Sequence, residues 1–513
     1  MTQRALPLVL AVLTVLSCAP SAQSPIEVVT LPSPDSPLVA IRLMFRVGSI
    51  HDPAGKEGLS ALTALMVGEA GSEAREYSEL IDALYPMAAS IQVSSDREVT
   101  VIRGEVHREK LAEYVDLLKE VLLSPGLREK DFTRNRNQLE TYLTNTLRAS
   151  NDELLGLETL QQAIFAGHPY GHAPQGSVSS LQAITLDDVR AFYNENYTQS
   201  NLMLGVAGGY PDGFVEELVE ALSALPRGEA GLLPLPEPPG VEGRDFLVVD
   251  KRTNSVGIHF GYPLPITRAD DDYYPLMVAN SYLGEHRTFF GRLMTELRGK
   301  RGLNYGDYSY IEYWHLPPFT SNPSPSYPRR QQYFSVWVRP VVPDTAHFAL
   351  RNAIYEVDRL VERGLTEEEF ALTRDYLVNY SKLWARTLSN RLGFLMDSRF
   401  YGMDYYIDEI ESRLSGLTVE QVNAAVRKYL STDSFQGVFV TDRAADVVAY
   451  LKADEPSPMT YNSPPEAEVV EADKTIEKLP VSVDDTRIIP VDQMFADGGL
   501  PAPESAGSET ATE

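Results

Sequence analysis

Gly-Leu-Arg-Glu-Lys-Asp-Phe at residues 126–132 is followed, 238 residues later, by the similar stretch Gly-Leu-Thr-Glu-Glu-Glu-Phe at residues 364–370. A second pair of similar segments, 181–189 and 414–422, lies 233 residues apart. A nearly constant offset between two separate pairs indicates an internal duplication. The sequence therefore predicts two homologous units within this chain of 513 residues.

Each unit is predicted to combine strands with helices. Leu38 to Val47 alternates and is rich in branched residues, which is typical of a strand, and Ser90 to Arg103 predicts one or two more. Arg108 to Leu123 places its apolar residues on one helical stripe. Thr185 and Thr418 each stand where an N-cap residue would begin a helix. We therefore predict an α+β fold, with helices covering one face of a mixed or antiparallel sheet in each unit.

Shifts in composition divide the chain into segments. A proline-rich stretch marks a linker between the two units, and the chain end is acidic, rich in proline and without apolar periodicity. Such a tail is predicted to be largely disordered, although Ile488 to Phe495 is apolar enough to dock on a folded surface. The expected segments are a signal peptide (1–22), an N-terminal domain (26–228), a linker (229–243), a C-terminal domain (244–452) and the tail (456–513).

The first residues predict export. Arg4 precedes the apolar run Ala5 to Leu16, which is too short to span a bilayer. The run ends at Ser17-Cys18 and resembles a bacterial lipoprotein box, in which Cys18 would be lipidated. The alternative is ordinary signal cleavage near Ser21 or Ala22. Both alternatives place the protein in the periplasm, and lipidation would make it an outer-membrane lipoprotein that contacts the membrane only through its N-terminus.

The composition excludes several functional classes. A formal charge of −27 argues against nucleic acid as a partner, because phosphate binding needs a basic surface. The acidity serves solubility or attracts basic peptides. Cys18 is the only cysteine, so neither a disulfide framework nor a thiol nucleophile can exist in the mature domains.

One loop of the first unit carries a resemblance to a known family. The stretch Val-Gly-Ser-Ile-His-Asp-Pro-Ala-Gly-Lys-Glu-Gly-Leu at residues 47–59 resembles the strand–loop–helix start of the insulinase-like zinc peptidases, which include pitrilysin, insulin-degrading enzyme and the mitochondrial processing peptidase. In that family the helix carries H-x-x-E-H, whose two histidines bind zinc and whose glutamate activates water. A glutamate further downstream is the third zinc ligand.

This chain departs from the family pattern at each of these positions. Ala61 and Leu65 stand at the two histidine positions, and Ala64 stands at the glutamate position. Asn135 is expected at the position of the third ligand. Alanine and leucine offer no donor atom, so the resemblance implies a chain without a metal site and without a cofactor of its own.

The second unit retains a different family signature. Leu-Arg-Gly-Lys-Arg-Gly-Leu-Asn-Tyr at residues 297–305 resembles the L-R-x-K-x-x-L-x-Y motif of the family's second domain. The resemblance implies that Arg298 grips the substrate backbone and that Tyr305 stabilises the oxyanion beside zinc, so both are candidate catalytic residues. The alternative is structural: the two side chains would only join a helix to a strand.

The resemblance also implies a peptide-binding edge strand. The segment Ala88 to Ser95 aligns with the strand that pairs with substrate in the family, so Ser90, Ile91, Gln92 and Val93 are candidate substrate-binding residues. Strand addition uses main-chain hydrogen bonds, and it therefore tolerates changes of side chain.

These features predict the non-catalytic subunit of a periplasmic heterodimeric zinc metallopeptidase. Arg298 and Tyr305 would act in trans on a peptide substrate held at the zinc of a homologous partner subunit, and proteolysis is expected only with that partner. The alternative is a stand-alone periplasmic peptide-binding or scaffold protein. An active hydrolase of another type is disfavoured, because the sequence has no G-x-S-x-G motif.

Overall fold

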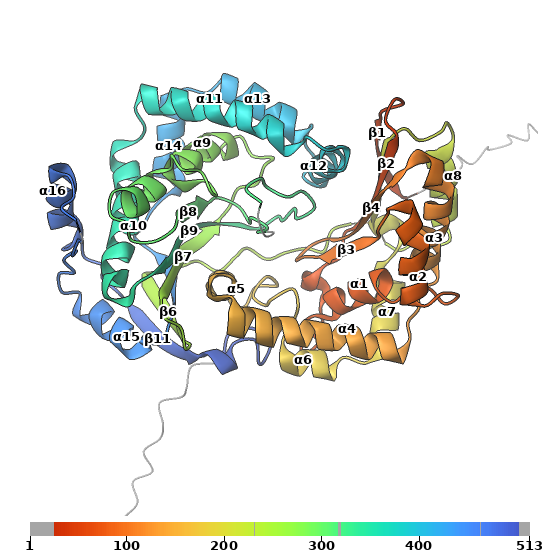
Figure 1. Cartoon of the computed structure of the whole chain (residues 1–513), viewed down its shortest axis with the longest axis horizontal. Helices are drawn as coiled ribbons and strands as arrows, with labels where there is room; N and C mark the ends of the chain where they lie inside the picture. Colours follow the sequence, from red (N-terminus) through yellow and green to blue (C-terminus); the bar gives the residue numbers. More distant parts are fainter. Residues whose placement is uncertain (1–24, 230, 317–319, 462, 502–513) are drawn as a thin grey trace, which may run out of the picture.

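The computed structural model describes residues 25–229, 231–316, 320–461 and 463–501. Two α+β halves lie side by side, each built on one sheet (Figure 1). The signal peptide, with Cys18, lies outside the described residues. None of the helices in the described part is both long and apolar enough to cross a membrane.

The first half contains a five-stranded sheet in the order β1-β5-β2-β4-β3, in which only β1 and β5 are parallel neighbours. Its strands are β1 (Glu27–Pro32), β2 (Leu38–Phe45), β3 (Gln92–Ser95), β4 (Thr100–His107) and β5 (Leu202–Gly208). Its helices are α1 (Leu59–Gly68), α2 (Tyr77–Leu84), α3 (Leu111–Leu123), α4 (Glu129–Thr141), α5 (Asp152–Ile164), α6 (Val178–Ala183), α7 (Leu186–Asn196) and α8 (Phe214–Leu222).

The second half contains a six-stranded sheet in the order β11-β6-β10-β7-β9-β8. Its strands are β6 (Arg244–Asp250), β7 (Val256–Leu264), β8 (Asp307–Tyr310), β9 (Gln332–Val341), β10 (Phe435–Thr441) and β11 (Asp485–Pro490). Its helices are α9 (Tyr273–Gly284), α10 (Ala346–Arg363), α11 (Glu367–Trp384), α12 (Leu388–Phe400), α13 (Tyr406–Ser415), α14 (Val419–Tyr429), α15 (Ala444–Ala453) and α16 (Ala467–Ile476).

The repeated segments occupy equivalent places in the two halves. The 126–132 and 364–370 stretches lead into α4 and α11, and the second pair leads into α7 and α14. Both predicted caps are confirmed, because the Thr185 and Thr418 hydroxyls accept hydrogen bonds from the backbone N–H three residues later, at 3.2 and 3.4 Å. The predicted α+β class with two homologous units is therefore confirmed.

The two halves exchange a helix. Leu392, Met396 and Phe400 of α12 pack on the first sheet, against Met44 and Met203. Conversely, α5 packs on β7 and β10 of the second sheet. The sequence predicted helices over one face of each sheet, and the structure covers the other face with a helix from the opposite half. This exchange fixes the two halves against each other.

The prediction of a largely disordered tail is wrong for residues 456–461 and 463–501. They include α16 and the edge strand β11, which runs parallel to β6. Beyond β11, Met494 and Phe495 are buried in the core of the first half, and the Phe495 carbonyl accepts from Val178 N–H at 2.9 Å. The predicted docking of Ile488–Phe495 is therefore confirmed, and burial of a few apolar residues outweighs the acidic composition.

Candidate functional site

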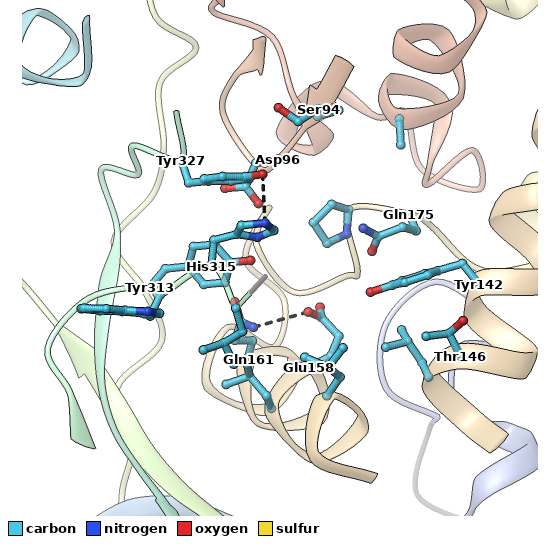
Figure 2. A pocket seen from close by; sticks show the side chains of 18 of the residues that line it. Ser94, Asp96, Tyr142, Thr146, Glu158, Gln161, Gln175, Tyr313, His315 and Tyr327 are labelled. Carbon is cyan, nitrogen blue, oxygen red and sulfur yellow. Dashed lines mark hydrogen bonds between the residues drawn. The ribbon is translucent and has the colours of Figure 1, made fainter. Parts of the chain in front are cut away.

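A cavity of about 810 Å³ lies between the two halves (Figure 2). Its walls come from α1, β3, the end of α4 and α5 of the first half, and from the loop between β8 and β9 of the second. We call this loop the strap and define it as residues 311–316 and 320–331. The cavity is the place where the predicted site residues can be compared.

The 47–59 loop has a structural role at the start of α1. Asp52 accepts hydrogen bonds from the Gly58 and Ser60 N–H groups, both at 2.7 Å, and so caps the helix. Gly58 has a φ of +97°, and a Cβ atom there would lie 2.6 Å from the Gln175 carbonyl oxygen. Burial raises the pKa of Asp52, and His172 beside it opposes that rise. The loop therefore sets the direction of α1 whether or not a metal is bound.

The positions expected to have lost their zinc ligands face the cavity. Ala61, Ala64 and Leu65 of α1 all line it. Their side chains carry no donor atom, so this wall offers a zinc ion nothing better than its own water shell. Among the described residues, no group of three or more His, Cys, Asp and Glu side chains is placed to hold a metal ion.

Asn135, the residue expected at the position of the third ligand, does not line the cavity. Asn135 is fully buried, and its amide Nδ2 lies 3.4 Å from the Met66 sulfur instead of facing the cavity. The residues near the end of this helix that line the cavity are Gln138, Leu139 and Tyr142. Tyr142 follows Asn135 by seven residues, which keeps it on the same helical face two turns later. Gln138, Leu139 and Tyr142, and not Asn135, therefore share the cavity lining with Ala61.

The predicted edge strand is present but shorter than expected. β3 pairs with β4 alone among the described strands, and it begins at Gln92, so Ser90 and Ile91 precede it. Val93 lines the cavity, whereas Ser90, Ile91 and Gln92 do not. The Ser90 carbonyl accepts from the Tyr114 hydroxyl at 3.2 Å. The part of the edge strand that can serve a cavity ligand therefore begins at Val93.

Arg298 and Tyr305 are brought together beside the cavity. The Arg298 guanidinium carbon lies 4.6 Å from the centre of the Tyr305 ring, and its Nη1 donates to the Met294 sulfur at 3.9 Å. Arg298 forms no salt bridge with any described residue. Tyr305 is 69% exposed, so its ring contributes little to packing. Neither side chain lines the cavity.

Arg339 connects this pair to the cavity wall. Its guanidinium carbon lies 5.5 Å from the Tyr305 ring centre, and its Nε donates to Glu153, a cavity residue, at 2.6 Å. Asp307 is buried nearby; burial raises its pKa to about 8, against the opposing effects of Asn304, Arg339 and Arg298. A neutral Asp307 leaves the positive charge of Arg298 unopposed at pH 7.

The strap is the part of the site that the sequence did not place. It leaves the second half and reaches the first, where Arg329 donates to both Asp96 oxygens at 2.7 Å. Arg330 donates to Glu98 through its backbone N–H at 2.6 Å and through Nε at 2.5 Å. Arg42 of β2 also bonds to Ser326. In the sequence the strap is distinguished only by its many aromatic residues and prolines. That composition does not indicate which residues of the first half the strap contacts.

The strap brings aromatic side chains into the cavity. Tyr313, Trp314, His315 and Tyr327 all line it, and the His315 and Tyr327 rings stack at 4.0 Å between centres (Figure 2). The His315 Nε2 lies 3.2 Å from the Tyr327 hydroxyl. Burial lowers the pKa of His315 to about 4, so the imidazole is neutral at pH 7.

Family models match both halves of the chain. Residues 27–174 match the model described as "Insulinase (Peptidase family M16)", and residues 183–377 match "Peptidase M16 inactive domain". A curated relative from Helicobacter pylori, "Non-peptidase homolog YmxG", is 24% identical over 414 residues, which cover 80% of this chain and 90% of the relative. An "Uncharacterized zinc protease YmxG" from Bacillus subtilis is 22% identical, covering 80% of this chain and 95% of that protein.

Solved structures share the fold. The crystal structure of a peptidase M16 inactive domain from Pseudomonas fluorescens superposes with a TM-score of 0.72 at 22% identity, covering 86% of this chain and 98% of that one. A protease from Helicobacter pylori superposes with a TM-score of 0.70 at 17% identity, covering 82% and 97%. At these identities the likeness concerns the fold alone.

Proposed function

Because this chain belongs to the insulinase family (peptidase family M16), we propose that it is the non-catalytic subunit of a heterodimeric zinc metallopeptidase. A homologous partner would bind the zinc and activate the water. This chain would supply Arg298 and Tyr305 in trans, Arg298 to hold the substrate backbone and Tyr305 to donate to the oxyanion.

One contrast carries the proposal. The side chains of Ala61, Ala64 and Leu65 offer no zinc donor. Arg298 and Tyr305, in contrast, stack together, with an exposed phenol ring and a guanidinium that forms no salt bridge with any residue the structure describes. An arginine left unpaired in a chain of net charge −27 is available to an external partner. Because the Tyr305 ring is mostly exposed, its hydroxyl can contact a ligand without any loss of packing in the core.

The proposed substrate is a peptide that adds to the free edge of β3. The reason is that, within the described part of the chain, β3 pairs with β4 alone, and that Val93, Ser94 and Ser95 of β3 line the cavity. Main-chain pairing at such an edge gives affinity that does not depend on zinc. Ser90, Ile91, Gln92 and Val93 are the proposed contact residues, with Val93 nearest to the cavity.

We further propose that the protein is exported to the periplasm. The basis is the N-terminal apolar run ending at Ser17-Cys18, which favours lipidation of Cys18 and an outer-membrane anchor. In this arrangement the subunit and its partner meet in the same compartment as the exported peptides they would degrade.

A stand-alone peptide-binding or scaffold protein is the second candidate. The observation that favours it is the strap, which forms one wall of the cavity within a single chain and is joined to the first half by the buried pair of Arg329 and Asp96. A cavity completed by the chain itself does not need a second subunit to form its walls.

Co-purification distinguishes the two candidates. The native protein would be isolated through a tag placed after residue 513, with an acidic exported protein of unrelated fold as the matched bait. Recovery of an insulinase-family chain with an intact H-x-x-E-H motif, in near-equal amount and absent from the control, supports the subunit. A monomer on size exclusion, with no such chain recovered, replaces the subunit proposal with the scaffold.

A further inference from the structure

Arg298 and Tyr305 belong to a longer stack in which aromatic rings alternate with guanidinium groups. Its members, from the exposed end to the buried end, are Phe289, Arg298, Tyr305, Arg339 and Trp337. The successive distances between guanidinium carbon and ring centre are 5.5, 4.6, 5.5 and 5.8 Å. All of them lie within the reach of a cation–π contact, which extends to about 6 Å. The Tyr305 ring therefore contacts two guanidinium groups, one from Arg298 and one from Arg339.

Arg339 of β9 also holds the turn that carries Tyr305. Its backbone N–H donates to the Gly306 carbonyl at 3.2 Å, and its carbonyl accepts from the Asn304 side-chain amide at 2.8 Å. These two partners flank Tyr305 in the sequence. The main chain of Arg339 therefore fixes the backbone on both sides of Tyr305, while its side chain contacts the ring between them.

The Arg339 side chain is itself oriented by the first half of the molecule. Its Nε donates at 2.6 Å to Glu153, which lies in the first turn of α5. A planar guanidinium that is bonded at one edge has few orientations left, so this bond restricts the direction of its face. The preceding Asp152 accepts from Thr253 of the second half at 2.7 Å and pairs with Lys251. The turn of α5 that holds Arg339 is thus itself bound to the second half.

An exposed ring needs such support if it is to act on a reacting atom. Tyr305 is 69% exposed, so the core contributes little to keeping its hydroxyl in one place. Groups that stabilise a transition state must be held to within about 0.5 Å of the productive geometry. A guanidinium against the ring restricts its motion and leaves the hydroxyl accessible.

We propose that Arg339 is a positioning residue for the Arg298–Tyr305 pair and that Glu153 acts on the pair through Arg339. The effect on catalysis rests on the proposed function, but the positioning does not, because every contributing residue belongs to this chain. The second half supplies the two groups that would act on a substrate, and the first half sets their orientation. The pair is then a property of the whole chain and not of the second half alone.

Fluorine NMR of the mature chain without a partner tests the positioning. 3-Fluorotyrosine would be introduced at position 305 alone, and its ¹⁹F resonance would be compared in the native chain and in the chain unfolded by urea. Arg339→Met should move the native resonance toward its unfolded position, because the ring loses a neighbouring guanidinium. Glu153→Gln should move it in the same direction, but less. The matched control is Arg75→Met, which breaks a partly exposed salt bridge with Glu120 inside the first half and should leave the resonance in place.

A double variant tests whether Glu153 acts through Arg339. Once Arg339 has been replaced by Met, adding Glu153→Gln should displace the resonance no further, because the group on which Glu153 acts has gone. Displacements that add up in the double variant would overturn the proposal, and so would a resonance that Arg339→Met leaves at its native position. If Arg339→Met fails to fold, Glu153→Gln keeps the size and shape of the side chain and decides alone, because an unmoved resonance in that variant also overturns the proposal.

Turnover measures the consequence for catalysis. In a pair reconstituted with a zinc-bearing homologue, Arg339→Met should lower kcat about 10- to 100-fold with the complex intact, because the Tyr305 hydroxyl is misplaced but still present. In a Tyr305→Phe background the same substitution should have almost no further effect on kcat, because the two residues act as a unit. An undiminished effect in that background would show that Arg339 acts elsewhere and would overturn the proposal.

The two measurements separate this proposal from the subunit role. A resonance that responds as expected, together with hydrolysis that Tyr305→Phe leaves unchanged, retains the positioning and removes the proposed function. A resonance that does not respond, together with a loss of turnover in Tyr305→Phe, does the reverse.

Discussion

Arg329 and Asp96 meet across 233 residues of sequence in a two-pronged salt bridge, with both N–O distances at 2.7 Å and both side chains almost completely buried. Burial disfavours the charge on Asp96, but the Arg329 guanidinium outweighs it and lowers the carboxyl pKa. Arg329 also donates to Gln161 of α5 at 2.8 Å and lies 3.3 Å from the Tyr313 ring centre. Arg329 is thus a deeply buried attachment of the strap to the first half, beside the Arg330–Glu98 pair and the Arg42–Ser326 hydrogen bond.

Removing that cation should destabilise the whole chain. Arg329→Met leaves Asp96 buried and unpaired, which typically costs about 3 to 5 kcal/mol in the free energy of unfolding. Arg190→Met is the matched control, because the Arg190 salt bridge with Asp187 lies on an exposed face of α7. The control should change stability by less than about 0.5 kcal/mol. Urea unfolding gives both values, and equal stabilities would show that the strap is not held by this pair.

The buried carboxyl of Asp307 should make stability depend on pH. Burial raises its pKa to about 8, so the folded state keeps a proton that the unfolded state releases above about pH 4. Stability from this group is therefore full below the unfolded pKa and declines as pH rises toward 8, by up to about 1.4 kcal/mol per pH unit. Asp307→Asn keeps the contact with Asn304 and removes the titration. Its unfolding free energy should fall less steeply than that of the wild type between pH 5 and 8, and parallel slopes would contradict the assignment.

Histidine and glutamate side chains introduced at positions that line the cavity should create a zinc site. We expect Ala61→His/Leu65→His/Tyr142→Glu to bind zinc, because all three positions line the cavity. The matched variant Ala61→His/Leu65→His/Asn135→Glu should bind far more weakly, because Asn135 contacts Met66 instead. The wild-type chain should hold no stoichiometric zinc. Elemental analysis and competition with a zinc dye measure all three. Equal affinity of the two triple variants would restore Asn135 as the third position, and tight zinc in the wild type would refute the loss of the site.

The mature N-terminus should be an acylated Cys18. The apolar run ending at Ser17-Cys18 is the motive, and intact mass spectrometry of protein from the membrane fraction of a Gram-negative host is the measurement. Cys18→Ser should move the protein to the soluble periplasmic fraction. An unmodified N-terminus at Ala22 or Gln23 would instead indicate ordinary signal cleavage.

Local signals in the sequence were sufficient for most of the fold. The apolar stripe of Arg108–Leu123 became α3, and the alternation of Leu38–Val47 became β2. Both signals depend only on residues that are close together in the sequence. β11 was not predicted, because its six residues begin with an aspartate and end with a proline. It forms a strand through its parallel pairing with β6. Tertiary pairing overrode composition there.

The site was predictable only in part, for two physical reasons. Helix periodicity identifies a face but not the turn that reaches a cavity, so Asn135 was chosen two turns before Tyr142, a rise of about 10 Å. The strap has no periodicity, and its contacts depend on distant partners such as Asp96 and Glu98. Arg298 and Tyr305 were proposed from one contiguous motif. They are only seven residues apart, so their contact does not depend on distant parts of the chain.

The proposed role in catalysis is tested most directly by the turnover of a reconstituted pair. The mature chain, or its Tyr305→Phe variant, would be mixed with a homologue that carries H-x-x-E-H, and peptide hydrolysis would be measured at saturating substrate. We expect Tyr305→Phe to lower kcat about 100- to 1,000-fold without loss of complex formation, because an oxyanion donor is removed while the exposed ring remains. Arg298→Ala should also raise KM. Unaltered hydrolysis by the pair after both substitutions, with the complex intact, would contradict the account.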